Sequence, residues 1–306
     1  MNFRSRVALI AAAFAIAVPV LAQTIVAPML KPENLKQVSP HVHVITDDGV
    51  AQVPNAGIVV GDRAALIIDT GLGARNGTIV LNAARKVAGT KPLYLVSTHI
   101  HPEHDMGAQA FPANVKMIRA ESQVKEIAGP DALTITEIFR KMSPLHKELL
   151  EGVTFRKADI TFDKDYILDL GSVSVRLLAV GPTHTPGDTV VWIASERVLF
   201  AGDAAMQGMP AFISPISSVR QWLTALDQLD ALKPAIIVPS HGPLGDAQFI
   251  ATYRTYLTEI RDRTAAEKKL GWRLEQVIER VSSAIGTRYP GNRLAGAISA
   301  AYREAP

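Results

Sequence analysis

Residues 97–107 read STHIHPEHDMG and follow an apolar run, residues 92–96, that predicts a buried strand. Three histidines and two carboxylates fall within seven residues of this stretch, between His99 and Asp105. Polar side chains at this density are costly to bury unless something binds them. A divalent metal is the simplest binder, because imidazole and carboxylate are its usual ligands.

The spacing of these side chains predicts two adjacent metal positions. His99 and His101 are two residues apart, so on an extended backbone they point the same way. Pro102 then bends the chain, and Glu103 and His104 can turn back toward a second position. The alternative is a polar surface loop that happens to hold three histidines. It is disfavoured, because the whole chain has only eight.

Further candidate ligands stand where other apolar runs end. His184 follows residues 173–180, Asp203 follows residues 198–200 and His241 follows residues 236–238. The ends of adjacent strands converge on one rim of a sheet, where binding sites commonly form. A single histidine after a strand is usually structural, but five of the eight histidines occur at such positions, together with two acids.

The segment around His99 resembles the His-x-His-x-Asp-His signature of the metallo-β-lactamase superfamily, with Glu103 where that family usually has Asp. The resemblance covers about residues 42–245. It implies a first metal bound by His99, His101 and His184, a second bound by His104 and His241, and a bridging carboxylate, Asp203. Glu103 occupies the Asp position of the second metal and is one methylene longer. It binds that metal if the loop shifts, and misses it otherwise.

A second short segment, Asp69-Thr70-Gly71, resembles the one that precedes the first helix in that family. In that family the aspartate does not bind the metal itself but supports the loop that carries the ligands. The alternative is a plain turn between strand and helix in which Asp69 is a capping group.

The order of the expected elements indicates an α/β protein with two sheets face to face and helices outside. The resemblance implies the four-layer αββα sandwich of the metallo-β-lactamase fold, and we treat residues 23–306 as one domain. Residues 119–158 are expected to form a helical insertion over one edge of the site, as a lid, a substrate wall or packing alone. Residues 105–110 are expected to begin a helix, and about residues 246–306 form C-terminal helices. The other expected elements are strands at 42–45, 56–60, 65–71, 115–118, 166–170, 173–180, 189–194, 197–200 and 235–239, and helices at 78–87 and 218–232.

Residues 1–22 have the features of a signal peptide. Arg4 and Arg6 precede an apolar run, residues 7–21, which is shorter than the roughly 20 residues that span a membrane, and Ala22 offers a cleavage site. We therefore expect a periplasmic or secreted protein without a stable membrane anchor. Without this segment the chain has 30 basic and 29 acidic residues, so charge gives no reason to expect nucleic-acid binding.

The expected function is metal-dependent hydrolysis of a small carbonyl substrate, with Glu103 and Asp203 as catalytic carboxylates. Two zinc ions are expected, although imidazole also suits iron and manganese. The chain contains no cysteine, which excludes thiolate ligands.

The expected substrate classes are lactone, thioester, ester and β-lactam. The β-lactam is disfavoured, because lactamases of the family have Cys or Ser where this chain has Asp203. The alternatives are an iron-dependent oxidoreductase that resembles persulfide dioxygenases, and a non-catalytic metal-binding protein.

Overall fold

The computed structural model describes residues 26–206, 217–289 and 294–306. Its first sheet contains seven strands in sequence order, β1 to β7. The pairs from β1 to β4 are antiparallel and those from β4 to β7 are parallel. The strands are β1 Leu35–Ser39, β2 Val42–Ile45, β3 Ala56–Val60, β4 Ala65–Ile68, β5 Leu93–Val96, β6 Lys116–Ala120 and β7 Ile160–Phe162.

The second sheet contains five strands in the order β12, β11, β10, β9, β8. Only the β11 and β12 pair is parallel. The strands are β8 Asp165–Asp169, β9 Ser174–Ala179, β10 Thr189–Ile193, β11 Val198–Gly202 and β12 Ile236–Pro239. This sheet therefore follows the first along the chain and carries the later candidate ligands at its strand ends.

The two sheets pack face to face through a shared apolar core. Leu66 and Ile68 of β4 belong to the same buried cluster as Val191 of β10 and Phe200 of β11. The contact is close enough that a Cβ on Gly57 would lie 2.3 Å from the Phe200 ring, so only glycine fits there.

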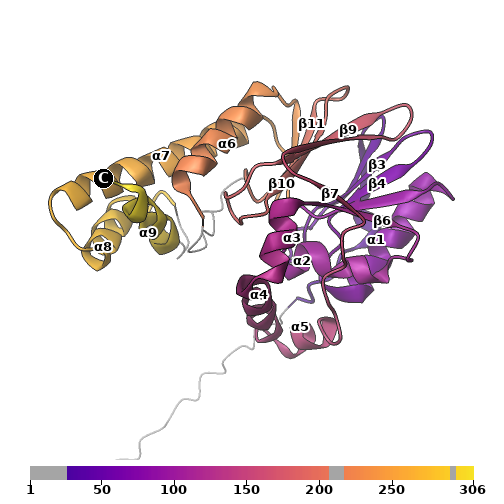
Figure 1. Cartoon of the computed structure of the whole chain (residues 1–306), viewed down its shortest axis with the longest axis horizontal. Helices are drawn as coiled ribbons and strands as arrows, with labels where there is room; N and C mark the ends of the chain where they lie inside the picture. The colour runs from indigo at the N-terminus through magenta and orange to yellow at the C-terminus, as the bar shows by residue number, and fades with distance from the viewer. Residues whose placement is uncertain (1–25, 207–216, 290–293) are drawn as a thin grey trace, which may run out of the picture.

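A helix covers the outer face of each sheet. Helix α1, Gly73–Ala88, buries Val80 and Ala84 against the first sheet, and α6, Val219–Ala231, buries Trp222 and Leu226 against the second. The two sheets lie between these helices (Figure 1), which confirms the expected αββα sandwich.

The helical insertion lies between β6 and β7. It forms α3 Glu121–Ala128, α4 Pro130–Arg140 and α5 Pro144–Leu149. It is shorter than the expected range of residues 119–158, because residues 119 and 120 complete β6 and no helix continues after Leu150. Gly129 and Pro130 separate α3 from α4, as a glycine followed by a proline at the first helical position favours.

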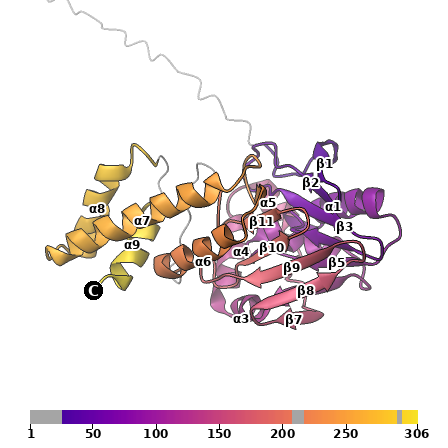
Figure 2. The ribbon, with the colours of Figure 1, turned by 90° about the horizontal axis from the view of Figure 1, so that it is seen from above.

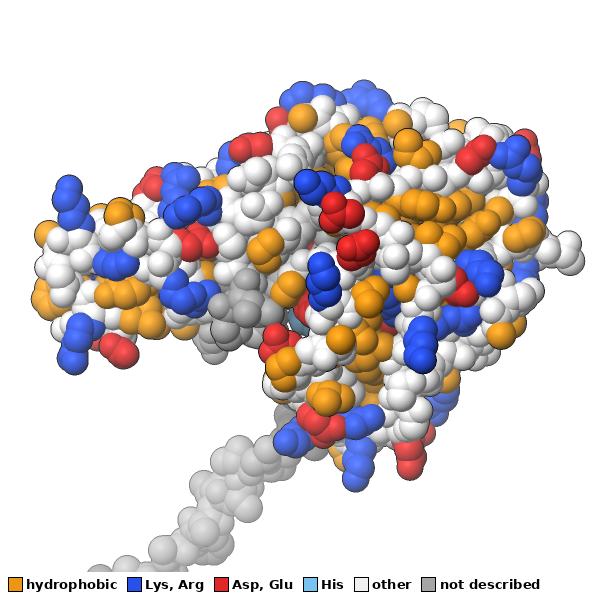
Figure 3. All heavy atoms as spheres, viewed as in Figure 1, with side chains coloured by type: hydrophobic (Ala, Val, Ile, Leu, Met, Phe, Trp, Pro, Cys, Tyr) orange, Lys and Arg blue, Asp and Glu red, His pale blue; other side chains and the backbone are white. Residues whose placement is uncertain are grey.

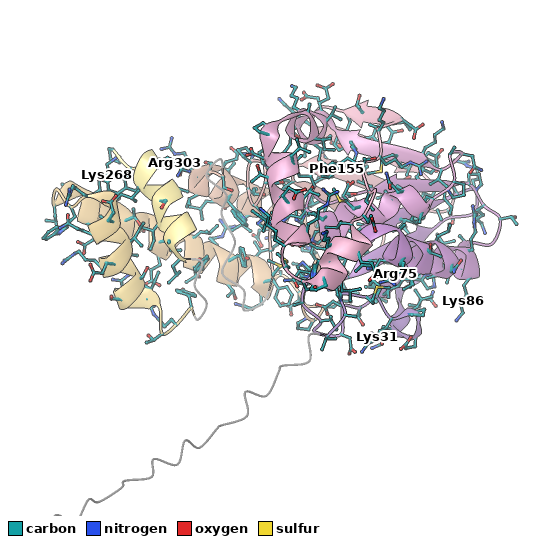
Figure 4. The ribbon with its side chains drawn as sticks, turned by 90° about the horizontal axis from the view of Figure 1, so that it is seen from below. Lys31, Arg75, Lys86, Phe155, Lys268 and Arg303 are labelled. Atoms are coloured by element: carbon teal, nitrogen blue, oxygen red, sulfur yellow. The ribbon has the colours of Figure 1, made fainter. Side chains whose placement is uncertain are left out.

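Three helices follow β12: α7 Gln248–Lys269, α8 Leu274–Ile285 and α9 Leu294–Glu304. They extend beyond α6, away from the strands (Figures 1 and 2), and pack on α6 through a continuous apolar cluster. Lys268 of α7 donates to the carbonyls of Tyr302 and Ala305, which ties α7 to the end of α9 (Figure 4).

Three short elements complete the fold: α2 Pro102–Asp105 and the 3-10 helices η1 Pro32–Asn34 and η2 Met106–Ala110. The segment expected to begin a helix, residues 105–110, is helical but divided: Asp105 ends α2, which starts earlier at Pro102, and residues 106–110 form the 3-10 helix η2. Strands β1 and β7 were not expected, since β1 is largely polar and exposed and β7 has three residues.

The predicted signal peptide, residues 1–22, lies outside the described residues. Within the described ranges, every helix is too short or too polar to cross a bilayer.

Candidate metal centre

The seven side chains predicted as ligands come together at one edge of the sandwich. Four of them follow β5 in the first sheet, and the others follow β9, β11 and β12 in the second. Both sheets end at this edge, so residues far apart in the chain meet there. The residues are His99, His101, Glu103, His104, His184, Asp203 and His241.

The first group consists of His99, His101 and His184. One potential ligand atom from each lies within 4.8 Å of the others. The Nε2 atom of His184 is 3.2 Å from Nδ1 of His101. The Nε2 atom of His99 is buried and has no hydrogen-bond partner. Three ring nitrogens therefore converge on one small volume.

The second group consists of Glu103, His104 and His241, whose ligand atoms also lie within 4.8 Å of one another. The Nε2 atom of His104 is 3.7 Å from a carboxylate oxygen of Glu103. The other Glu103 oxygen and His104 Nε2 are buried without hydrogen-bond partners. Helix α2 thus brings the longer Glu103 side chain to this group.

Asp203 lies between the two groups. Its ligand atom lies within 4.8 Å of those of His99 and His104, so it reaches a member of each group. Its Oδ2 atom is 3.3 Å from Nε2 of His184, whereas Oδ1 is buried without a partner.

Four buried polar atoms in this cluster therefore lack partners, one each from His99, Glu103, His104 and Asp203. An unsatisfied buried polar group destabilises a fold by about 1–3 kcal/mol, so four together need an explanation. Divalent cations supply it, because imidazole nitrogens and carboxylate oxygens are their ligands. The donor set fits a pair of metal ions.

The protonation states of His99, His101 and Asp203 also suit metal binding. Burial lowers the pKa of His99 and of His101 well below the ordinary value, so both rings are neutral, the form that binds metal. Burial alone would raise the pKa of Asp203, but the nearby imidazoles, led by His184 and His241, outweigh it and hold that pKa well below its usual range. Asp203 is therefore an anion at neutral pH.

Asp69 fixes the orientation of His104, as the resemblance of its segment implied. Its carboxylate accepts hydrogen bonds from the backbone N–H and the hydroxyl of Thr98 at 2.7 and 2.9 Å and lies 2.9 Å from His104 Nδ1. Burial would lower the pKa of His104, but Asp69 raises it to about 9. This contact leaves Nε2 of His104 pointing at the second group.

His241 is oriented from a different loop. Its Nδ1 donates to the carbonyl of Val53 at 2.8 Å, in the segment between β2 and β3. Asn55 donates to the carbonyls of Pro239 and Gly242, which secures the same loop on both sides of His241. Sequence reasoning missed this support, because nothing local marks Val53 or Asn55.

A buried network behind the metal loop was also missed. Arg119 forms two hydrogen bonds with Asp105, at 2.5 and 2.9 Å, and both side chains are fully buried. Gln123 of α3 donates to the carbonyls of Ser97 and Gly187 at 2.8 and 3.2 Å. The insertion therefore ties the loop of His99 to the loop of His184.

A cavity of about 500 Å³ opens above the metal groups. Its floor includes His101, Glu103, His184, Asp203 and His241. Its walls are largely apolar and include Val50, Ala51, Ile135, Ile138, Phe139, Met142 and Met206. Met209, Pro210 and Phe212, which follow Met206 in the sequence, lie outside the described residues.

A family model described as the metallo-beta-lactamase superfamily matches residues 50–241, more than half of the chain. The chain belongs to the metallo-β-lactamase superfamily. Within this superfamily, the chain is 26% identical over 188 residues to an acyl-coenzyme A thioesterase from Bos taurus, covering 57% of this chain and 66% of the relative. It is 21% identical over 259 residues to a linear primary-alkylsulfatase from a Pseudomonas strain, covering 73% of this chain and 49% of that protein. The chain therefore spans about half to two thirds of the length of these curated relatives.

Solved structures of the superfamily share the fold. A sec-alkylsulfatase from Pseudomonas superposes with a TM-score of 0.69 at 17% identity, over 89% of this chain and 50% of its own. A metallo-beta-lactamase from Pontibacter korlensis superposes with a TM-score of 0.60 at 21% identity, over 75% of this chain and 99% of its own. Thioesterase, alkylsulfatase and β-lactamase are all names of hydrolases, so membership of this superfamily supports a metal-dependent hydrolase.

Proposed function

We propose that the protein is a two-zinc hydrolase that cleaves a small, neutral carbonyl substrate: an ester, a thioester or a lactone. The observation that carries this proposal is the set of unpaired, buried donor atoms on the floor of an apolar cavity. His99, His101 and His184 would hold one ion, Glu103, His104 and His241 the other, and Asp203 would lie between them. When bound, two such ions lower the pKa of a water molecule and polarise the scissile bond.

The carboxylates have separate roles in this proposal. Asp203 is anionic and lies between the groups, so its charge offsets the repulsion between two cations. Burial raises the pKa of Glu103, which leaves this group able to hold a proton whenever no cation faces it. Hydrolysis breaks the bond from the carbonyl carbon to the leaving oxygen or sulfur. Water supplies a hydroxyl to that carbon and a proton to the leaving group.

The described walls of the cavity offer no basic side chain to an anionic substrate. Among the described residues that line it, three are acidic, Asp47, Glu103 and Asp203, and none is Lys or Arg. Residues 207–216, which follow Met206 in the sequence, also contain no Lys or Arg. A sulfate ester or the carboxylate of a β-lactam would thus find no basic side chain on the described walls. This distinguishes the proposal from the activities that the alkylsulfatase and β-lactamase relatives are named for.

Zinc is proposed because its usual ligands are the nitrogen and oxygen donors present here. Iron accepts the same imidazoles and carboxylates, and an iron-loaded protein would favour the oxidoreductase alternative instead. Elemental analysis of the purified protein separates the two. We expect two zinc ions per chain in the wild type and a clear loss of zinc in His184→Ala.

The activity test is a substrate panel run on the zinc-loaded protein. It pairs neutral esters, thioesters and lactones with a β-lactam and an alkyl sulfate. We expect turnover of the neutral compounds, with little for the two anionic ones, and its loss in His184→Ala. Bound zinc without turnover of any compound would favour the non-catalytic alternative.

We also propose that the chain is exported and acts in the periplasm or outside the cell. The support is the sequence of residues 1–22, with Arg4 and Arg6 before an apolar run and a cleavage site at Ala22. N-terminal sequencing of exported protein should begin at or near Gln23. A mature chain that retains Met1 would contradict this.

A further inference from the structure

The cavity above the metal groups has one wall made by a single helix of the insertion. Ile135, Ile138, Phe139 and Met142 line it from α4 and the turn that follows. These positions are spaced three, four and seven residues from Ile135, so they form one stripe along a helical surface. The insertion therefore presents an apolar face to the site.

The exposure of these side chains changes along the stripe. Phe139 is 4% exposed and its ring lies 6.4 Å from that of His101, at the floor of the cavity. Ile138 and Met142 are 49% and 42% exposed. The stripe thus leads from a candidate ligand to solvent. In Figure 3, hydrophobic side chains gather on the surface over the region that α4 occupies in Figure 1.

Other segments also contribute apolar side chains to the cavity. Val50 and Ala51, from the segment between β2 and β3, line it together with Met206 after β11. Asn55 secures that segment to the backbone on both sides of His241, so this wall is held in place. Among the described residues, apolar walls and a polar floor thus form a channel above the metal groups.

We propose that this channel is a subsite for a linear aliphatic chain of the substrate, with the scissile group at the metal floor and the chain running out along α4. This inference rests on the proposed hydrolase function and specifies its substrate class. The aliphatic chain of the substrate would cover Ile138 and Met142, which otherwise leave apolar surface exposed beside a polar site. The described walls along this path are apolar. The acidic lining residues are Glu103 and Asp203 on the floor and Asp47 in the loop after β2.

The test measures kcat/KM across esters of increasing chain length. One series, p-nitrophenyl esters from acetate to decanoate, puts the chain on the acyl side; the other, alkyl acetates, puts it on the leaving group. We expect kcat/KM to rise in one series by about two- to fourfold for each added methylene, up to the length of the channel, since burying a methylene gives at most about fourfold.

Two variants and a matched control locate the effect. Ile138→Ser and Met142→Ser should each reduce the rise per methylene, and the double variant should nearly abolish it. Leu133→Ser is the control, because Leu133 is also on α4 and is 72% exposed but does not line the cavity. Leu133→Ser should keep the wild-type dependence of kcat/KM on chain length. Zinc content measured on every variant establishes that the metal groups are intact.

A second readout does not depend on turnover. Calorimetric titration of the zinc-loaded protein with octanoate and with butanoate should show tighter binding of octanoate in the wild type and in Leu133→Ser, and a reduced difference in Met142→Ser. If esters are cleaved but rates and binding do not depend on chain length, the subsite is wrong and the hydrolase function stands. If no ester is cleaved yet octanoate is preferred, the subsite stands and the proposed function fails.

Discussion

Glu103 is the residue at which this chain departs from the family signature. The structure accounts for the longer side chain, because α2 starts at Pro102 and carries the carboxylate to within reach of His104 and His241. An extra methylene therefore does not exclude Glu103 from the second group. Glu103 either binds metal there or only carries a proton. Removing its charge by a single substitution distinguishes these two roles.

We predict that Glu103→Gln weakens zinc binding in the second group about tenfold or more and leaves the first group filled. The amide keeps the length of the side chain but is neutral, so it is a poor ligand. A chelator titration should show earlier release of one zinc ion while the other is released as in the wild type.

The control for this prediction is Glu126→Gln, which removes another buried glutamate outside both groups. Its zinc release should match the wild type. If Glu103→Gln binds both ions with unchanged affinity and loses turnover, Glu103 is a proton carrier and not a ligand.

Among the elements, α3 supports the site through hydrogen bonds to residues near the candidate ligands. Gln123 joins the carbonyl of Ser97, before His99, to that of Gly187, after His184. Two loops from different sheets are thus held at a fixed separation by one side chain. The first metal group takes its donors from those same two loops.

We predict that Gln123→Met destabilises the protein by about 1–3 kcal/mol, because it removes the donor to the buried Ser97 carbonyl and an acceptor of the buried Arg119 guanidinium. It should also weaken zinc binding at the first group about tenfold, since His99 and His184 would no longer be held in register. Urea denaturation and zinc titration measure the two effects. Gln109→Met, at an exposed glutamine, is the control. Reduced stability with normal zinc affinity would make Gln123 a purely structural residue.

A second prediction for α3 concerns Glu126, whose carboxylate accepts from the Gly187 N–H at 3.0 Å. Burial, followed by the nearby Asp188 carboxylate, raises the Glu126 pKa from 4.5 to about 8. The folded state therefore binds a proton that the unfolded state releases, and stability falls as pH rises from about 4.5 to 8. Glu126→Gln keeps an acceptor for Gly187 and has no charge to lose.

Between pH 5 and pH 8, the free energy of unfolding of the wild type should therefore fall by up to a few kcal/mol more than that of Glu126→Gln. Denaturation of both proteins at pH 5, 6.5 and 8, with zinc in excess, gives the difference directly. Parallel stability profiles for the two proteins would show that Glu126 is already ionised in the folded state. Asp188, whose pKa is also raised by burial, contributes to the pH dependence that remains in the variant.

At the scale of the whole molecule, much of the site could be predicted because each ligand follows an apolar run. The candidate ligands from His99 to His104 lie in one short segment, and His184, Asp203 and His241 follow strands of the second sheet. The supporting contacts could not be predicted in the same way. Arg119 of β6 and Gln123 of α3 bond to residues distant in the sequence, and those partners are fixed only when the chain has folded. The edge strands β1 and β7 could not be predicted, because they are defined by hydrogen bonding to a neighbouring strand and not by an apolar pattern.

We predict that metal removal lowers the melting temperature of the whole chain. Ligands that bind only the folded state stabilise it by about 4 kcal/mol at a thousand times their dissociation constant, which corresponds to a shift on the order of 10 °C here. Thermal melts at stepped free zinc concentrations measure this. His184→Ala should lose most of the dependence on zinc, and a wild-type melting temperature unaffected by a chelator would argue against any tightly bound metal.

Each metal group takes donors from both sheets: His99 and His101 meet His184, and Glu103 and His104 meet His241. During synthesis the ribosome releases the first sheet long before His241 exists, so a growing chain holds only partial ligand sets. The first group needs His184 but not His241, so only the filling of the second group must wait until β12 has joined its sheet. In a chain that crosses a membrane unfolded, neither group is assembled before transit, so both ions would be acquired in the destination compartment and not carried there from the cytosol.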